Sequence, residues 1–269
     1  MSIIIVYLAC VSVAATPLSE GNKTSVQAMK SYEQAYDALM ENIVNVKTPA
    51  YKSIDTMFEQ AENGGIQAEQ STQYTRGSLE ETNRPLDVAI DGNGFLVVEL
   101  TKGIKVTQQN RLQMVAGTGY TRDGRFQINE NNELVTLVGG YRVLGKGGAI
   151  VLAPYSGQGD NIVYITPQGA VLQNNNVIGE LQVVTIDKMK QLERLNGSFF
   201  RVPLGRTDFV ITDVPEVKLR SGYVEASNVD LSRQLVELPL NQRKYDANSK
   251  ALQLLRRTES TAREMGRVQ

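Results

Sequence analysis

The 269-residue sequence contains no histidine and no tryptophan, and its single cysteine is Cys10. The absence of histidine excludes a Ser-His-Asp triad, a histidine general base and a histidine-ligated metal. A single cysteine excludes a zinc site made of cysteines and any disulfide within the chain. We therefore predict no catalytic residues, no cofactor and no metal site, and the composition favours a structural protein over an enzyme.

An excess of charge of one sign is also lacking, because 28 Lys and Arg residues stand against 29 Asp and Glu residues. Nucleic acids and anionic membranes select proteins with a basic surplus. The length and the 41% hydrophobic content are sufficient for one large or two modest folded domains. We expect a globular protein that binds no nucleic acid and no small-molecule substrate.

The apolar run from Ile3 to Ala15 is too short to span a bilayer as a helix. Its length fits the hydrophobic region of a signal peptide, and small residues precede Thr16, but no basic residue comes before it. Residues 1–20 are therefore interpreted as an apolar N-terminal extension. A secretory signal, a lipoprotein signal at Cys10, a buried strand and a start codon placed too early all stay open.

Helical periodicity marks both ends of the chain. From Met29 onward, apolar residues recur at steps of three and four, which predicts an amphipathic helix that Pro49 ends. A second long helix is predicted over residues 230–264, with Pro239 inside it, where proline should kink or locally break it. Its apolar residues occupy two sides, so we expect it to have more than one partner.

Between the two predicted helices, the sequence has the alternation and turn residues of short strands. Asp-Gly pairs predict two hairpins, one joining 86–90 to 95–98 and one joining 120–122 to 125–128. A further turn at 129–132 leads into a strand at 134–138. The pattern is typical of an antiparallel sandwich or barrel. Further strands are predicted at 140–144, 162–165, 170–173 and 179–186.

Four segments carry motifs in a fixed order. The first predicted helix ends in Glu41-Asn42-Ile43-Val44-Asn45-Val46-Lys47-Thr48-Pro49-Ala50-Tyr51-Lys52. The second and third motifs are residues 84–95 and 120–126, and the fourth is 222–230 followed by 242–250. In this order, and from about residue 20 to the end, the sequence resembles the flagellar rod and hook protein family.

Two positions depart from the pattern of that family. Ala50 occupies the place of a glycine, so the turn after Pro49 is expected to differ or to avoid a positive φ angle. Pro239 stands where the family helix usually carries an apolar helix former. The amount of β structure between the helices favours a rod subunit, with a proximal rod subunit as the first choice and a distal rod subunit as the second.

The resemblance, together with the periodicity, implies an α+β fold. The N- and C-terminal helices are expected to pair as a coiled-coil-like domain, and the middle of the chain is expected to form a central antiparallel β domain. The predicted helical axial-assembly domain comprises residues 21–52 and 222–269. Residues 53–76 are expected to be a linker, and residues 77–221 are expected to form the β domain.

The resemblance also implies a function. A rod subunit is exported, lies in the periplasm-spanning rod of the flagellar basal body, assembles helically, transmits torque and encloses the export channel. The implied partners are other copies of the chain, other flagellar rod and hook proteins and the flagellar export apparatus. Polar and terminal residues of the helices are the predicted assembly contacts: Asn42, Asn45, Thr48, Pro49, Tyr51, Asn228, Gln242, Arg243, Tyr245 and Asn248.

Two functions of other classes stay open on the residues alone. A secreted, β-rich carbohydrate-binding or hydrolytic protein would also combine short strands with a cleaved signal. A periplasmic lipoprotein scaffold would be anchored through Cys10. Saturable glycan affinity of the monomer would favour the first, and detergent-dependent extraction that is lost on Cys10→Ser would favour the second.

Overall fold

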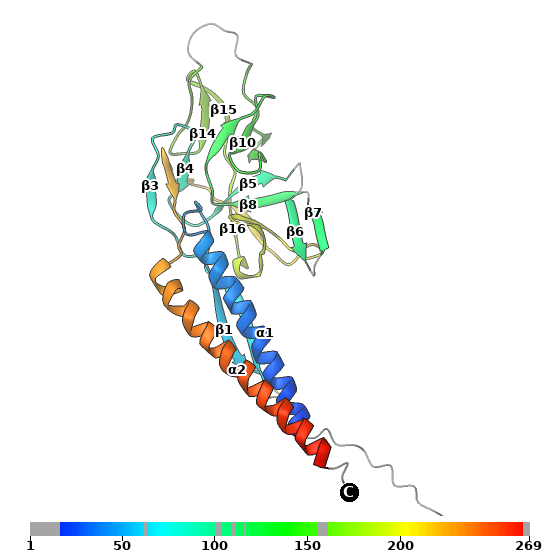
Figure 1. Ribbon diagram of the computed structural model, residues 1–269. Helices are drawn as coiled ribbons and strands as arrows, with labels where there is room; N and C mark the ends of the chain where they lie inside the picture. The colour runs from blue at the N-terminus through cyan, green and yellow to red at the C-terminus, as the bar shows by residue number, and fades with distance from the viewer. Residues whose placement is uncertain are drawn as a thin grey trace, which may run out of the picture. The chain divides into compact units, whose positions relative to one another are not determined.

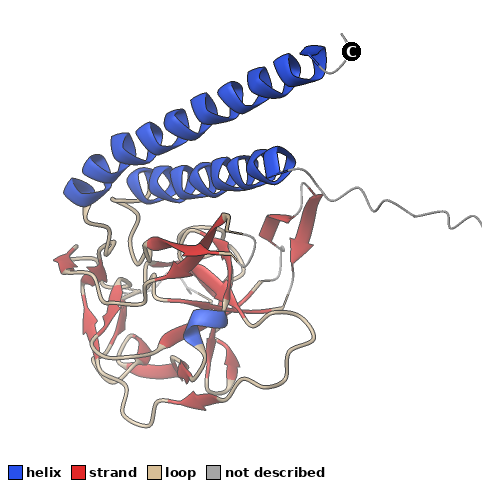
Figure 2. Cartoon of the chain, turned by 90° about the horizontal axis from the view of Figure 1, so that it is seen from below, coloured by secondary structure: helices blue, strands red, loops and turns tan. Residues whose placement is uncertain are grey.

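The computed structural model describes residues 17–61, 64–100, 104–108, 111–115, 117–154 and 161–265 (Figure 1). Its content is two long helices near the chain ends and many antiparallel strands between them in sequence, which agrees with the predicted α+β class (Figure 2). The chain divides into two compact units. The helical unit comprises residues 1–40, 56–70 and 235–269, and the β unit comprises residues 41–55 and 71–234.

The interpretations of residues 1–20 fall almost entirely on residues 1–16, which lie outside the described residues. Helix α1 spans Pro17–Val44 and begins with a proline, a residue suited to the first turn of a helix. Its buried side chains recur at steps of three and four, which confirms the predicted amphipathic helix. Within the helical unit they are Ala28, Ser31, Tyr32, Ala35, Ala38 and Leu39.

Helix α2 spans Leu231–Met265 and starts at an aspartate cap. The carboxylate of Asp230 accepts a hydrogen bond from the backbone N–H of Arg233 at 3.1 Å, which satisfies one of the free donors of the first turn. The helix continues through Pro239 without a break. Since proline has no N–H, the carbonyl of Leu235 lacks its usual donor within the helix. In the part of the chain that is described, neither long helix has the apolar length needed to cross a membrane.

The prediction that the terminal helices pair as a coiled-coil-like domain is wrong. A coiled coil places apolar residues against the partner along an unbroken seam. In the predicted seam of α2, Leu252 is buried but Leu235 is 54% exposed. The helices meet through polar contacts, among them a hydrogen bond of 2.8 Å from Asn241 Nδ2 to the carbonyl of Tyr32. A second bond of 2.7 Å joins Asn22 Nδ2 to Glu259 Oε1, so the two helices are antiparallel.

A two-stranded sheet also packs against α1, within the range that was predicted to be a linker. It consists of β1 (Ile54–Gln60) and β2 (Ile66–Thr72). Ser31 Oγ donates to the carbonyl of Ile66 at 2.8 Å, and the rings of Tyr32 and Phe58 lie 5.1 Å apart. These two strands were not predicted, because both are largely polar and lack a regular apolar alternation.

The largest sheet of the β unit has ten strands. Seven follow the order β17-β18-β8-β5-β11-β10-β9, β12 pairs with β11, and β16 pairs with β5 and β19. The strands are β5 (Phe95–Glu99), β8 (Thr118–Thr121), β9 (Phe126–Ile128), β10 (Leu134–Thr136), β11 (Arg142–Gly145), β12 (Gly148–Ala149), β16 (Val183–Ile186), β17 (Glu193–Asn196), β18 (Phe199–Arg201) and β19 (Ile211–Asp213).

Smaller sheets complete the β unit. The three-stranded sheet contains β13 (Val163–Ile165), β14 (Ala170–Gln173) and β15 (Asn176–Glu180). The two-stranded sheets pair β3 (Leu79–Glu81) with β21 (Tyr223–Glu225), β4 (Val88–Ile90) with β20 (Leu219–Ser221), and β6 (Ile104–Gln108) with β7 (Arg111–Val115). A short 3-10 helix, η1, spans Met189–Gln191. The strands expected near 142, 163, 170 and 183 are thus present.

The two predicted Asp-Gly hairpins are wrong, whereas the turn at 129–132 is confirmed because β9 and β10 pair antiparallel. β4 pairs with β20 and β5 pairs with β8, so neither Asp-Gly segment joins neighbouring strands. The guanidinium of Arg122 explains the first failure. It donates to the carbonyls of Gly92 and Gly94, at 3.1 and 2.6 Å, and holds this segment open instead of letting it close into a two-residue turn.

The main apolar core lies inside the β unit and is built from small sheets and the large sheet together. Val88 and Leu219 from the two-stranded pair belong to the same buried cluster as Leu96 and Phe126 of the large sheet. A second cluster centres on aromatic rings, with Phe95 and Phe200 edge to face at 6.0 Å. Packing in this core holds in place the strands that carry the motif segments.

Candidate functional site

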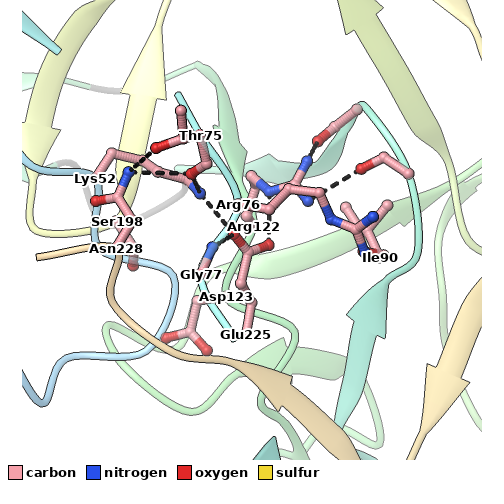
Figure 3. A network of polar contacts seen from close by, with 12 residues as sticks. Lys52, Thr75, Arg76, Gly77, Ile90, Arg122, Asp123, Ser198, Glu225 and Asn228 are labelled. Atoms are coloured by element: carbon pink, nitrogen blue, oxygen red, sulfur yellow. Dashed lines mark hydrogen bonds and ion pairs between the residues drawn. The ribbon is translucent and has the colours of Figure 1, made fainter. Parts of the chain in front are cut away.

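A buried carboxylate, that of Glu225 at the end of β21, lies where the motif segments meet (Figure 3). Lys52 Nζ is 2.5 Å from Oε1 of Glu225, and Arg122 Nε is 2.8 Å from Oε2. The backbone N–H of Gly77 also donates to Oε1, at 3.1 Å. The side chains of Lys52 and Glu225 are 0% exposed and that of Arg122 is 5% exposed. Lys52, Gly77, Arg122 and Glu225 are called the Glu225 network below.

Backbone contacts bring the first and fourth motifs to this point. The N–H of Ala50 donates to the carbonyl of Glu225 at 2.7 Å. The strand pairing of β3 with β21 places Leu79 opposite Glu225, so Gly77 lies beside the carboxylate. A Cβ atom at Gly77 would lie 2.0 Å from the carbonyl oxygen of Ala226. Only glycine therefore permits the close approach that aims its N–H at Glu225.

Arg122 attaches the second motif to the third. Its Nε binds Glu225 while its two terminal nitrogens bind the carbonyls of Gly92 and Gly94. The neighbouring Thr121 donates through Oγ1 to the carbonyl of Ser198 at 2.9 Å. One arginine thus joins the loop after β4, the end of β8 and the end of β21, as its planar, multidentate guanidinium permits.

Asn42, near the start of the first motif, forms hydrogen bonds with the chain that follows this motif. Its Oδ1 accepts from the N–H of Ile54, and its Nδ2 donates to the carbonyl of Ile54, both at 2.8 Å. The hydroxyl of Tyr51 donates to the same Oδ1 at 3.2 Å, and Nδ2 also contacts Gln234 Oε1 at 3.1 Å. Asn42 is fully buried, so its amide replaces the hydrogen bonds that water would otherwise make.

Asn228 plays a matching role in the fourth motif. Its Oδ1 accepts from the N–H of Ser53 at 2.7 Å, and its Nδ2 donates to the carbonyl of Gln73 at 2.8 Å and to Thr75 Oγ1 at 2.9 Å. Beside it, the guanidinium of Arg194 stacks 4.7 Å from the ring centre of Tyr51. The amides of Asn42 and Asn228 therefore fasten the chain on both sides of Lys52.

Ala50 adopts a φ angle of 56°, in the left-handed region that glycine prefers. The expectation that the backbone here avoids a positive φ angle is therefore wrong, whereas a turn that differs from that of the family stays a prediction. Asn45 and Thr48 hold the preceding turn, since Thr48 Oγ1 donates to Asn45 Oδ1 at 3.0 Å. Contacts on both sides of Ala50 keep the backbone in this conformation despite its cost.

The charges of the network are unequal, because two cations face one carboxylate. Burial alone would raise the pKa of Glu225, but the charges of Arg122 and Lys52 lower it below its usual value. Carbonyl oxygens offset the surplus positive charge: Lys52 Nζ also donates to the carbonyl of Thr75 at 2.7 Å. Each charged group is thus held by protein atoms, and the arrangement can crosslink chain segments.

Two groups of predicted assembly residues lie in different places. Asn42, Thr48, Tyr51 and Asn228 hold the β unit together from within. Four others are on α2 in the helical unit: Gln242 and Arg243 are exposed, Asn248 Nδ2 donates to the carbonyl of Lys244 at 2.9 Å, and the hydroxyl of Tyr245 donates to Glu33 Oε1 at 3.3 Å. The last two, Asn45 and Pro49, belong to the β unit and are half-buried.

Sequence reasoning did not assign roles to Glu225, Arg122 or Lys52, although all three lie in the motifs. Each is one polar or charged residue among several in its motif, and no spacing in the sequence marks the three as partners. The buried amides of α2 are Gln234 and Asn241, whereas the predicted Gln242 is exposed. Among the described residues, there is no group of three or more His, Cys, Asp or Glu side chains that could hold a metal ion.

Comparisons with known proteins agree with this architecture. Residues 89–189 match the model of the flagellar hook protein FlgE/F/G D1 domain, and residues 220–265 match the model of the flagellar basal body rod FlgEFG protein C-terminal region. The first match covers the third motif and residues 89–95 of the second, and the second match covers the fourth motif. These two families define the class as flagellar structural proteins.

Relatives extend the match over nearly the whole chain. The flagellar basal-body rod protein FlgF of Mesorhizobium japonicum is 30% identical over 89% of this chain and 93% of its own length. FlgG of Bacillus subtilis is 26% identical over 85% of this chain and 92% of its own length, and FlgF of Salmonella typhimurium is 23% identical over 83% and 89%. The chain belongs to the family of flagellar basal-body rod proteins, and it is a structural component of the flagellar basal body.

Proposed function

We propose that this chain is a non-enzymatic rod subunit that assembles helically through its helical unit with copies of itself and with other rod and hook proteins. The observation that carries the proposal is the apolar surface of α2. Leu235 is 54% exposed and Val236 is 63% exposed, and the next turn adds the exposed Leu240. Contiguous apolar side chains of this kind are typical of surfaces that another protein covers.

A helical stack needs contacts between two different patches of each subunit, because only such contacts continue without closing into a dimer. Exposed apolar side chains on α1, among them Met40 and Val26, supply a second surface of the same character. Gln242 and Arg243 are exposed on α2 and are proposed as polar contacts at the edge of these surfaces. Asn42, Tyr51 and Asn228 act instead by holding the β unit in one conformation.

Torque transmission requires a subunit that does not deform under load. The Glu225 network supports this role, because removing one partner from a buried ion pair leaves an uncompensated charge, and the pair therefore resists separation. We further propose that the assembled subunits enclose the export channel, and that the chain meets the export apparatus on its way to the rod. A proximal position in the rod is the first choice, since only β1, β2 and β3 separate Lys52 from Leu86.

The test is electron microscopy of basal bodies from a strain that lacks this chain and from the same strain complemented with variants. Loss of the chain should leave an incomplete rod and non-motile cells. A variant carrying Leu235→Ser, Val236→Ser and Leu240→Ser should fold but should be depleted from basal bodies. The matched control carries serine at the exposed polar positions Lys250, Gln253 and Glu264 of the same helix, which lie outside the proposed contacts. Intact rods in the deletion strain would contradict the proposed function.

A further inference from the structure

The helical unit contains a groove of about 360 Å³ between the two helices, some two turns beyond Pro239 along α2. Three tyrosines and three carboxylates line it, alongside amide groups of α2. The tyrosines are Tyr32, Tyr36 and Tyr245, and the carboxylates are those of Glu33, Asp37 and Asp246. Aromatic rings and acids in one concave place are an unusual combination for a helix surface.

The electrostatics of the groove are unfavourable in an isolated subunit. Glu33 and Asp37 are four residues apart on α1, a spacing at which like charges repel, and Asp246 adds a third negative charge from α2. Among the residues that the structure describes, no ion pair joins any of the three to a basic side chain. Partial desolvation and the charges of Glu33 and Asp246 raise the pKa of Tyr245 above its usual value.

The chemistry of the lining fits a guanidinium group. Carboxylates bind its planar fork through two hydrogen bonds, and tyrosine faces attract its charge. Tyr36 is 39% exposed, so a ring at the mouth of the groove is free for stacking. An ammonium group would satisfy the charge but would gain less from the rings and the fork geometry.

The chain itself carries a suitable cation. Arg256 and Arg257 are consecutive and exposed on α2, and no ion pair of the described residues includes either of them. Arg257 is three helical turns beyond Asp246 on the same helix, about 16 Å along its axis. An arginine side chain cannot span that distance, so the arginine pair of one chain is out of reach of its own groove.

We propose that the groove receives the Arg256–Arg257 segment of a second copy of this chain. The inference rests on the proposed function and adds to it a specific contact between neighbouring subunits. The groove and the arginine pair of one copy lie at different positions along α2. When two copies are in contact, one of them still has a free groove and the other still has a free arginine pair. A contact of this kind repeats along a filament.

The test is a charge exchange in the full-length chain, expressed in the deletion strain. Asp246→Arg alone and Arg257→Asp alone should each lower the amount of the chain in purified basal bodies about tenfold, since each change places like charges together at the contact. The double variant carries both changes in every copy and restores opposite charges at each contact. It should recover at least half of the wild-type amount.

Controls separate this contact from folding and from general charge effects. Lys250→Asp makes the same charge reversal on the same helix outside both clusters, and it should leave the amount of incorporated chain unchanged. The neutral variants Asp246→Asn and Arg257→Gln should show smaller losses of about threefold. Circular dichroism and urea unfolding of each purified variant identify any that fail to fold. If a charge-reversal variant fails to fold, the losses measured for Asp246→Asn and Arg257→Gln decide whether the contact exists.

Two outcomes would overturn the inference. If Asp246→Arg and Arg257→Asp each leave the amount of incorporated chain unchanged, the groove and the arginines do not meet. Single losses without recovery in the double variant would show that the partner is another protein and not a second copy. Both outcomes leave the proposed function intact if rods still require the chain, whereas intact rods without the chain would remove the proposed function itself.

Discussion

The β unit and the helical unit differ in where they place their apolar and charged groups. The β unit buries its apolar side chains in connected clusters and also buries three charged side chains in the Glu225 network. The helical unit buries small residues and hydrogen bonds, and it leaves large apolar side chains such as Val236 exposed. The β unit is therefore stabilised from within, whereas we expect the helical unit to gain stabilisation when another chain covers its exposed apolar side chains.

The largest difference between the units should appear on removing the charge of Glu225. We expect Glu225→Gln to lower the free energy of unfolding by about 3–5 kcal/mol, because two buried cations lose their counter-charge. The matched control is Glu180→Gln, which breaks the exposed pair with Lys146 and should cost less than about 1 kcal/mol. Urea unfolding of the purified chain measures both. Equal costs would mean that the Glu225 network is no more important than a surface pair.

A backbone test of the same region uses Gly77. Gly77→Ala would place a Cβ atom 2.0 Å from the carbonyl oxygen of Ala226, so the strands must separate. We expect a loss of about 3 kcal/mol and weaker binding of Lys52 to Glu225. Gly147→Ala is the control, since nothing lies within 4 Å of its Cβ position, and it should change the melting temperature by no more than about 2 °C. A stable Gly77→Ala variant would contradict the packing described here.

The pH dependence should also distinguish the two units. The folded-state pKa of Glu225 lies below the ordinary value of 4.5, so its contribution is fully present above pH 4.5 and is lost as the pH falls through the lower, folded value. The urea midpoint of the β unit should therefore fall on the acid side, and the fall should be smaller in Glu225→Gln. Near-ultraviolet dichroism follows this transition through the tyrosines of the β unit. An identical acid limb in both proteins would rule out Glu225 as the titrating group.

A smaller and opposite effect is expected at Ala50. Because its φ angle is 56°, Ala50→Gly should relieve strain and stabilise the chain by about 1 kcal/mol. Ala149→Gly, at an exposed strand position without positive φ, should instead destabilise by about 0.5–1 kcal/mol. Thermal unfolding compares the two. A destabilised Ala50→Gly variant would show that lost entropy outweighs the strain of the left-handed conformation.

The smallest stability effect should come from the exposed face of α2. Val236→Ser removes a side chain that is 63% exposed, and we expect a change within about 0.5 kcal/mol in a verified monomer. Leu252→Ala, at a position that is only 8% exposed, should cost about 2–3 kcal/mol. Urea unfolding followed at 222 nm measures both. A large loss for Val236→Ser would mean that its own chain already covers this face.

The sequence predicted the two helices and the strands β4, β5, β8, β9, β10, β11, β13, β14 and β16, because their periodicity is local. It failed at the strand partners of β4 and β8, because Asp-Gly pairs favour tight turns and Arg122, far along the chain from Gly92, overrides that preference. It missed β1 and β2, whose polar strands carry no apolar pattern. The predicted domain boundaries stay predictions, although Lys52 and Glu225, which were predicted to lie in the helical domain, belong to the compact β unit.

The sequence predicted the motifs that contribute to the candidate site, but it did not predict that their residues meet in one place. Asn42 and Asn228 were chosen for contacts between subunits, and the structure places both in hydrogen bonds within the β unit. A polar residue in a helix or turn has the same appearance in a sequence whether its partner is within the chain or beyond it. Only the folded structure shows that the backbone N–H groups of Ile54 and Ser53 donate hydrogen bonds to these amides.

The Lys52–Glu225 pair has a consequence for the timing of folding. The two residues are separated by 173 positions, so the pair closes a loop that includes most of the β unit. Closing so long a loop carries an entropic cost before any contact is gained, and chains dominated by such contacts fold slowly. During synthesis, Lys52 and Arg122 emerge long before their carboxylate does. We therefore expect the β unit to complete its folding only after Glu225 has been synthesised, in the last fifth of the chain.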